Sequence, residues 1–140
     1  MLTADANVWA RALLNDNQAQ TKRARSALAQ ARSQEGVFIP LLVLAELSWV
    51  LRGRWEKQRV LDALEGLLRA RGVTVESPGL ARRAIEAARN GATGFADHLI
   101  AEVSLDAGVR EIITFDKAFG RLSRVRRLIG SVRTHSRPRL

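Results

Sequence analysis

Residues 36–51 read GVFIPLLVLAELSWVL, an apolar triplet followed by a long apolar run that contains one acidic residue. The triplet Val37–Ile39 is β-branched and aromatic and lies between Gly36 and Pro40, which predicts a short buried strand. Proline suits the first position of a helix because it has no N–H group to leave unbonded, and we expect that helix to run over Leu41–Arg52. A buried strand that leads directly into an apolar helix is typical of α/β proteins with parallel strands.

Short apolar segments and helices alternate on both sides of this stretch. The sequence predicts further strands at Met1–Ala4, Val73–Val75, Glu111–Phe115 and Val125–Ile129. It predicts helices at Val8–Leu14, Gln18–Ser33, Trp55–Arg71, Leu80–Asn90, Phe95–Asp106 and Asp116–Leu122. Parallel strands need such crossover helices, so we expect a three-layer α/β/α sandwich with a short, mostly parallel central sheet. The 140 residues suit one domain, which we assign to residues 1–140.

The composition excludes several classes of protein. The chain has no cysteine, which excludes a disulfide scaffold, thiol catalysis and a cysteine-ligated metal site. The N-terminus lacks a basic region followed by an apolar run, and the longest apolar run is too short to span a bilayer. We therefore expect a cytoplasmic protein that does not insert into membranes.

The net charge of +9 is concentrated near the C-terminus. Residues 117–140 contain eight lysines and arginines and no acidic residue. Because a guanidinium pairs with a phosphate through two hydrogen bonds, this basic segment is a candidate to bind phosphate or nucleic acid. The first candidates are Lys117, Arg121, Arg124, Arg126 and Arg127. The alternative is a solvated tail without a ligand.

Two acidic residues follow predicted strands. Asp5 comes after the first apolar segment, and Asp116 comes after the strand that ends at Phe115. The carboxyl ends of parallel strands meet at one edge of a sheet, where ligands bind in open α/β folds, so we expect both carboxylates at that edge. The alternative for each is a helix cap at a strand-to-helix turn.

Glu46 interrupts the apolar helix over Leu41–Arg52. Because that helix is apolar nearly all round, we expect it to be buried and Glu46 with it. An ionised buried carboxylate needs a cation, and no lysine or arginine lies three or four residues away. A metal ion or a distant arginine remains, and we favour the metal ion.

Asp97 lies in the first turn of the helix predicted at Phe95–Asp106, where the helix dipole favours a negative charge. The alternative is an ordinary N-terminal helix residue. With Asp5, Glu46 and Asp116 it makes a set of oxygen donors without sulfur, which suits Mg²⁺ or Mn²⁺ better than zinc. The neighbouring His98 points to another side of the helix, so we interpret it as structural or, as the weaker alternative, as a residue that positions a metal ligand.

Four sequence blocks resemble the PIN-domain ribonucleases, in the order found in VapC-type toxins of toxin–antitoxin pairs. The blocks are Asp5–Val8, Phe38–Leu47, Phe95–Ile100 and Thr114–Lys117, and the similarity extends from Asp5 to about Leu128. The acidic positions of the family fall on Asp5, Glu46, Asp97 and Asp116. The usual Asp-Thr-Asn reads Asp5-Ala6-Asn7, which keeps Asn7 as a supporting residue, and Thr114 matches a supporting polar position.

The resemblance implies a Mg²⁺- or Mn²⁺-dependent endoribonuclease in which the four acidic residues are the catalytic residues and metal ligands. A metal ion lowers the pKa of a bound water, which attacks the phosphorus and leaves a 5′-phosphate and a 3′-hydroxyl. The resemblance also implies inhibition by a small VapB-like antitoxin, and we expect a homodimer. The competing hypothesis is a non-catalytic basic module that binds nucleic acid or protein, in which the acids only cap helices and pair with arginines.

Overall fold

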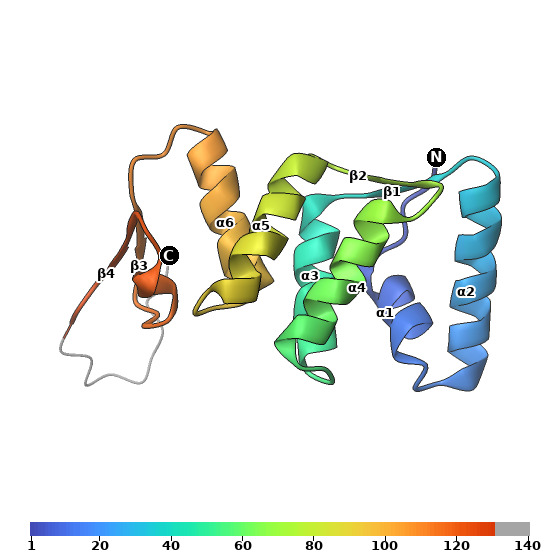
Figure 1. The fold of residues 1–140 in the computed structure, drawn as a ribbon. Helices are drawn as coiled ribbons and strands as arrows, with labels where there is room; N and C mark the ends of the chain where they lie inside the picture. Colours follow the sequence, from blue (N-terminus) through green and yellow to red (C-terminus); the bar gives the residue numbers. More distant parts are fainter. Residues whose placement is uncertain (131–140) are drawn as a thin grey trace.

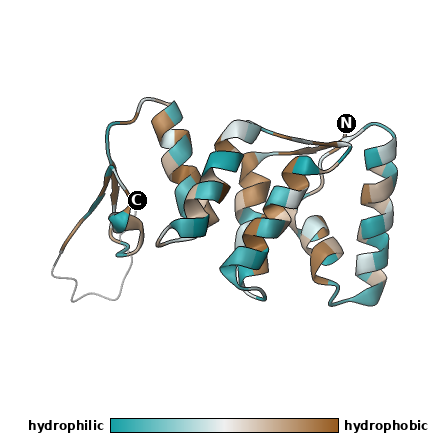
Figure 2. Cartoon of the chain, viewed as in Figure 1, coloured by the Kyte–Doolittle hydropathy of each residue, from teal (hydrophilic) through white to brown (hydrophobic). Residues whose placement is uncertain are grey.

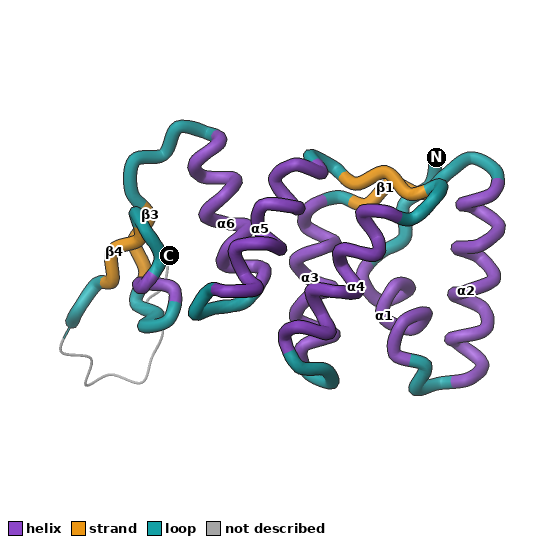
Figure 3. Tube along the Cα trace, in the orientation of Figure 1, coloured by secondary structure: helices purple, strands orange, loops and turns teal. Residues whose placement is uncertain are grey.

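The computed structural model describes residues 1–130, and Figure 1 shows their path. The helices are α1 (Ala6–Leu14), α2 (Gln18–Ser33), α3 (Leu41–Arg52), α4 (Lys57–Arg69), α5 (Pro78–Asn90) and α6 (Phe95–Asp106). The strands are β1 (Val37–Ile39), β2 (Val73–Val75), β3 (Ile112–Thr114) and β4 (Val125–Arg127), with the 3-10 turn η1 (Phe119–Arg121) before β4. Helices and short parallel strands alternate, as Figure 3 shows, and the predicted α/β class is confirmed.

The strands form two separate parallel pairs. In the first pair β1 lies beside β2, with Val37 opposite Val73 and Ile39 opposite Val75. The N-terminal segment joins the free side of β1 through a single parallel bridge between Leu2 and Val37. In the second pair β3 lies beside β4. Figure 1 shows this second pair beyond α6, at the opposite end of the molecule from α1 and α2.

The described strands are short and parallel, as predicted, and they fall into two pairs within residues 1–130. Between the pairs, α6 ends at a glycine turn. Gly108 adopts the left-handed conformation, with φ of 83°, and three backbone hydrogen bonds from Ala107, Gly108 and Val109 close on the last turn of the helix.

Helix α3 lies at the centre of the hydrophobic core. Its residues Leu44, Leu47 and Leu51 are fully buried, and it packs against α1, α4 and α6. Helices α1 and α4 turn an apolar stripe inward, and Figure 2 shows hydrophilic residues along α2 and α4. Helix α6 differs, because Ile100, Val103 and Leu105 on it are exposed. None of the helices among residues 1–130 is long and apolar enough to cross a membrane.

Several predicted boundaries shift because acidic caps start the helices. Asp5 caps α1, which therefore begins at Ala6 and not at Val8, and Glu56 caps α4, which begins at Lys57 and not at Trp55. The predicted strand at Met1–Ala4 is reduced to the bridge at Leu2. The short helix expected after Asp116 is only the η1 turn.

Candidate active site

Asp5 stands where the N-terminal segment enters α1. Its Oδ1 accepts a hydrogen bond of 3.1 Å from the backbone N–H of Val8, so the carboxylate caps the helix. Both Asp5 and the supporting candidate Asn7 are exposed. The capping alternative is thus correct in part, but the cap uses one carboxylate oxygen and leaves the side chain open to solvent and to a ligand.

Glu46 is exposed, and the prediction of a buried carboxylate on α3 is wrong. The same side of the helix also exposes Leu42 at 71% and Trp49 at 67%, four residues before and three residues after Glu46. These three residues form one stripe at helical spacing, while the opposite stripe of α3 is buried in the core. An exposed carboxylate needs no internal cation, so burial no longer argues for a metal ion at Glu46.

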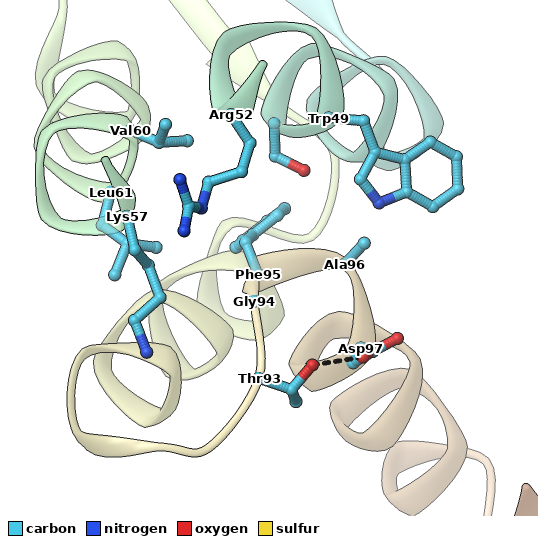
Figure 4. Close-up of a pocket in the computed structure, with 11 residues that line it drawn as sticks. Trp49, Arg52, Lys57, Val60, Leu61, Thr93, Gly94, Phe95, Ala96 and Asp97 are labelled. Carbon is cyan, nitrogen blue, oxygen red and sulfur yellow. Dashed lines mark hydrogen bonds between the residues drawn. The ribbon is translucent and has the colours of Figure 1, made fainter. Parts of the chain in front are cut away.

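Asp97 is the candidate that lies at a pocket. It is half-buried in the first turn of α6, and the hydroxyl of Thr93 donates a hydrogen bond to its Oδ2. The pocket has a volume of about 240 Å³ and lies between α3, the start of α4 and the loop before α6. Figure 4 shows Thr93 and Asp97 at one end of it, with the ring of Trp49 nearby.

Two basic residues that sequence reasoning missed line the same pocket. Arg52 ends α3 and Lys57 begins α4, and both side chains extend from the other side of the pocket in Figure 4. Backbone oxygens hold them in place, since Arg52 donates to Trp55 at 3.0 Å and Lys57 donates to Gly91 at 2.9 Å. The pocket is therefore lined by two cations and one carboxylate, and its cations could attract an anionic group such as a phosphate.

Asp116 lies with the second strand pair. Its Oδ1 accepts a hydrogen bond of 2.7 Å from Phe119 N–H and caps the η1 turn, while its own N–H donates to the hydroxyl of Thr114 at 3.0 Å. Thr114 therefore supports Asp116, as predicted. Asp116 does not share a sheet with the Leu2 segment, so the expectation that it meets Asp5 at one sheet edge is wrong within the described chain.

The five basic candidates lie between Asp116 and the end of β4. Lys117, Arg121, Arg124, Arg126 and Arg127 are all exposed. Arg126 pairs with Glu111 at 3.0 Å, and this hydrogen bond lowers the pKa of the Glu111 carboxyl and raises the pKa of Arg126. The rest of the segment predicted as basic, residues 131–140, lies outside the described residues.

The four predicted metal ligands are not gathered in one place. Their carboxylate oxygens suit a hard divalent cation in chemistry. Their arrangement does not fit one, because within residues 1–130 no three histidine, aspartate or glutamate side chains come close enough to hold a metal ion. The ligand roles of Asp5, Glu46, Asp97 and Asp116 stay predictions, and no catalytic step is derived through a metal ion.

His98 supports the Asp97 turn from inside the protein. It is 6% exposed, and its Nε2 makes no hydrogen bond within the described residues. Burial, assisted by the nearby Lys57, lowers the pKa of His98 below its ordinary value of 6.5, while Asp97 and Glu102 oppose the shift. The structural role predicted for His98 agrees with this environment.

The lowered pKa of His98 predicts a pH dependence of stability. As the pH falls through 6.5, the unfolded chain binds a proton that the folded chain resists, so folding stability is lost towards acid. We expect the melting temperature to fall between about pH 8 and about pH 5.5, with a smaller fall for His98→Gln. Thermal denaturation at several pH values in this range measures the change of melting temperature with pH for the wild type and for His98→Gln. Equal changes in the two proteins would contradict the assignment to His98.

Gly91 keeps space for His98 next to the loop that carries Thr93. A Cβ at Gly91 would overlap the His98 ring and come within 2.8 Å of the carbonyl oxygen of Ala87. We expect Gly91→Ala to lower the free energy of unfolding by about 1–3 kcal/mol. Gly66, exposed inside α4 with no atom within 4 Å of its added Cβ, is the matched control.

Gly66→Ala should raise the free energy of unfolding by about 0.5–1 kcal/mol, because alanine favours the helix. Urea denaturation of both variants gives the two values. A Gly91→Ala variant that is no less stable than the wild type would show that the space at Gly91 does not constrain the loop.

Comparison with known families gives one match. The model of the PIN domain family matches residues 3–125, which is most of the chain. No curated protein and no solved structure matches the chain. The match includes all four predicted acidic residues.

Proposed function

Because the chain belongs to the PIN domain family, whose members are generally nucleases, we propose that it is a metal-dependent endoribonuclease and the toxin of a VapBC-type toxin–antitoxin pair. It would act in the cytoplasm on RNA phosphodiester bonds. Asp5, Glu46, Asp97 and Asp116 would form the active site, with Asn7 and Thr114 in support.

The observation that carries this proposal is the pocket at Asp97. A half-buried carboxylate that accepts a hydrogen bond from Thr93 lines the same pocket of about 240 Å³ as Arg52 and Lys57. Two cations attract a phosphodiester, and a carboxylate beside them is unfavourable for binding alone because it repels the same anion. A carboxylate in this position is useful when it takes part in the chemistry.

The proposed dependence on a divalent metal ion rests on the ligand atoms that the four acidic side chains offer. The four acidic residues offer only oxygen donors, which is the ligand type that Mg²⁺ and Mn²⁺ prefer. We expect purified protein to cleave RNA with Mn²⁺ or Mg²⁺ and to stop when EDTA is added.

The competing proposal is a non-catalytic module, and it predicts a different result in the same RNA cleavage assay. The exposed arginines and lysines on the second strand pair favour phosphate binding, and both Asp5 and Asp116 do cap turns. Intact RNA that stays bound, with an affinity that falls steeply as salt is raised, would support the module and exclude the nuclease.

A toxin needs an inhibitor, and α3 offers an apolar surface for one beside Asp97. Leu42, Trp49 and Ile100 line a groove between α3 and α6 that adjoins the Asp97 pocket. We propose that an amphipathic helix of a VapB-like antitoxin packs its apolar side here and directs a basic side chain towards Asp97. Trp9 on α1 is 4% exposed and belongs to the core, so it is not part of this surface.

A further inference from the structure

Trp49 is the most exposed of the three tryptophans of the chain. Trp9 is 4% exposed and belongs to the core. Trp55 is half-buried, and the guanidinium carbon of Arg59 lies 4.1 Å from the centroid of its ring. The ring of Trp49 is 67% exposed on α3 and lies at the edge of the Asp97 pocket. Trp49 is therefore the tryptophan that is available to contact a ligand.

Two cations line the same pocket as this ring. Arg52 follows Trp49 by three residues, a spacing that places both on one side of α3. Lys57 reaches the pocket from the first residue of α4. In Figure 4 the charged ends of Arg52 and Lys57 lie on one side of the pocket, and the ring of Trp49 and Asp97 lie on the other.

Neither cation is neutralised by a carboxylate. Within residues 1–130 several other arginines form ion pairs, but Arg52 and Lys57 form none. Each donates one hydrogen bond to a backbone oxygen, which holds its side chain in place. A guanidinium has five N–H donors and an ammonium group has three, so most of their donors remain for a phosphate.

The size of the pocket indicates which part of a nucleotide it takes. Its volume of about 240 Å³ is below the roughly 300–1,000 Å³ of pockets that enclose a whole drug-sized ligand. Its floor includes Leu61 and Phe95, which are 0% and 3% exposed. A phosphate and part of its sugar fit inside, and the base of that nucleotide then lies outside, at the rim where Trp49 stands.

We propose that Trp49, Arg52 and Lys57 form a nucleotide-binding subsite beside Asp97. Arg52 and Lys57 hold one phosphate of the RNA backbone, and the ring of Trp49 stacks on a base of the adjoining nucleotide. This subsite rests on the nuclease function proposed above, and it positions the strand so that a neighbouring phosphodiester lies at Asp97.

Trp49 also lines the apolar groove between α3 and α6, together with Leu42. An apolar partner helix in that groove needs neither Arg52 nor Lys57, whereas an aromatic ring next to two cations is the pattern of a site for a nucleic acid strand. Leu42 does not line the Asp97 pocket, so it separates the two uses of this surface.

The stacking contact is tested by binding of a short, unstructured, fluorescein-labelled RNA in EDTA, where no cleavage is expected. Trp49→Ala should weaken binding about tenfold, since a stacked base is worth about that much, and Trp49→Phe should retain most of the affinity. Leu42→Ala is the matched control, because Leu42 is 71% exposed on the same stripe of α3, and its affinity should equal that of the wild type.

The phosphate contact is tested by the dependence of the same binding on salt concentration. Arg52→Gln should reduce the slope of log affinity against log salt by about 0.7–1, because one phosphate contact is lost. Trp49→Ala should lower the affinity at every salt concentration without changing the slope. Arg82→Gln, which removes the same charge from an exposed residue of α5 outside the pocket, should change neither quantity.

Three results would overturn the subsite. They are a wild-type protein that does not bind the RNA, a Trp49→Ala variant that binds as well as the wild type or no worse than Leu42→Ala, and equal slopes for Arg52→Gln and Arg82→Gln. Circular dichroism of each variant verifies that it is folded.

Cleavage assays with Mn²⁺ distinguish the subsite from the nuclease function. Trp49→Ala should raise KM about tenfold with a smaller change in kcat, because stacking away from the reacting phosphate stabilises substrate and transition state alike. Wild-type protein that binds RNA through Trp49 and Arg52 but does not cleave it would refute the nuclease function and leave the subsite. Cleavage by the wild type, with no loss of affinity in either variant, would refute the subsite and leave the nuclease function.

Discussion

Asp97→Asn is expected to lower the rate of RNA cleavage by at least about a hundredfold while the protein stays folded. Even groups that only support a metal ligand cost about 10–100-fold when they are removed, and Asp97 is the proposed ligand itself. The asparagine keeps the volume of the side chain and an oxygen that can accept the hydrogen bond from Thr93. The expected loss of cleavage rate therefore comes from the missing negative charge at residue 97 and not from a change in structure.

Asp106→Asn is the matched control for this prediction, because Asp106 is exposed at the other end of the same helix α6. Its cleavage rate should equal that of the wild type. Initial rates on a defined RNA, with circular dichroism to verify folding, measure both variants. A folded Asp97→Asn protein with a rate near that of the wild type would remove Asp97 from the active site.

Leu44→Ala is expected to give the largest loss of stability, about 2–5 kcal/mol in the free energy of unfolding. Leu44 is fully buried in α3, the helix that packs against α1, α4 and α6. Its truncation leaves a cavity that these neighbours cannot fill without moving. The measurement is the urea midpoint and slope at one fixed protein concentration.

Leu42→Ala provides the comparison within the same helix, since Leu42 is 71% exposed. We expect its effect to stay within about 0.5 kcal/mol. Equal losses from the two substitutions would mean that α3 is covered on both sides in the unliganded protein and that its exposed stripe is wrongly placed.

The local elements could be predicted from the sequence because short-range chemistry determines them. Val37–Ile39 forms a strand and Leu41–Arg52 a helix as expected, since the β-branched triplet and Pro40 act within a few residues. The core could be predicted less well. An apolar helix such as α3 buries one stripe and exposes another, and apolar pattern alone does not reveal that Glu46 lies on the exposed stripe.

The assembly of the site depends on contacts between distant segments, which local patterns do not specify. Asp5 and Asp116 do act as caps, as the alternative for each predicts, because a carboxylate before a helix or turn has that use regardless of the fold. Gly108 indicates that α6 ends there, and it does not indicate where β3 lies. Arg52 and Lys57 belong to no motif in the sequence. Only the packing of α3 and α4 around the Asp97 pocket identifies them as residues of the site.

The chemistry of the RNA ends tests the central claim most directly. Purified protein is incubated with a defined RNA and Mn²⁺, and the new ends are mapped and their termini identified. The proposed nuclease predicts internal cuts with a 5′-phosphate and a 3′-hydroxyl, absent with EDTA and absent for Asp97→Asn. Cuts that persist in EDTA, or ends that carry a 2′,3′-cyclic phosphate, would contradict metal-dependent hydrolysis at these carboxylates.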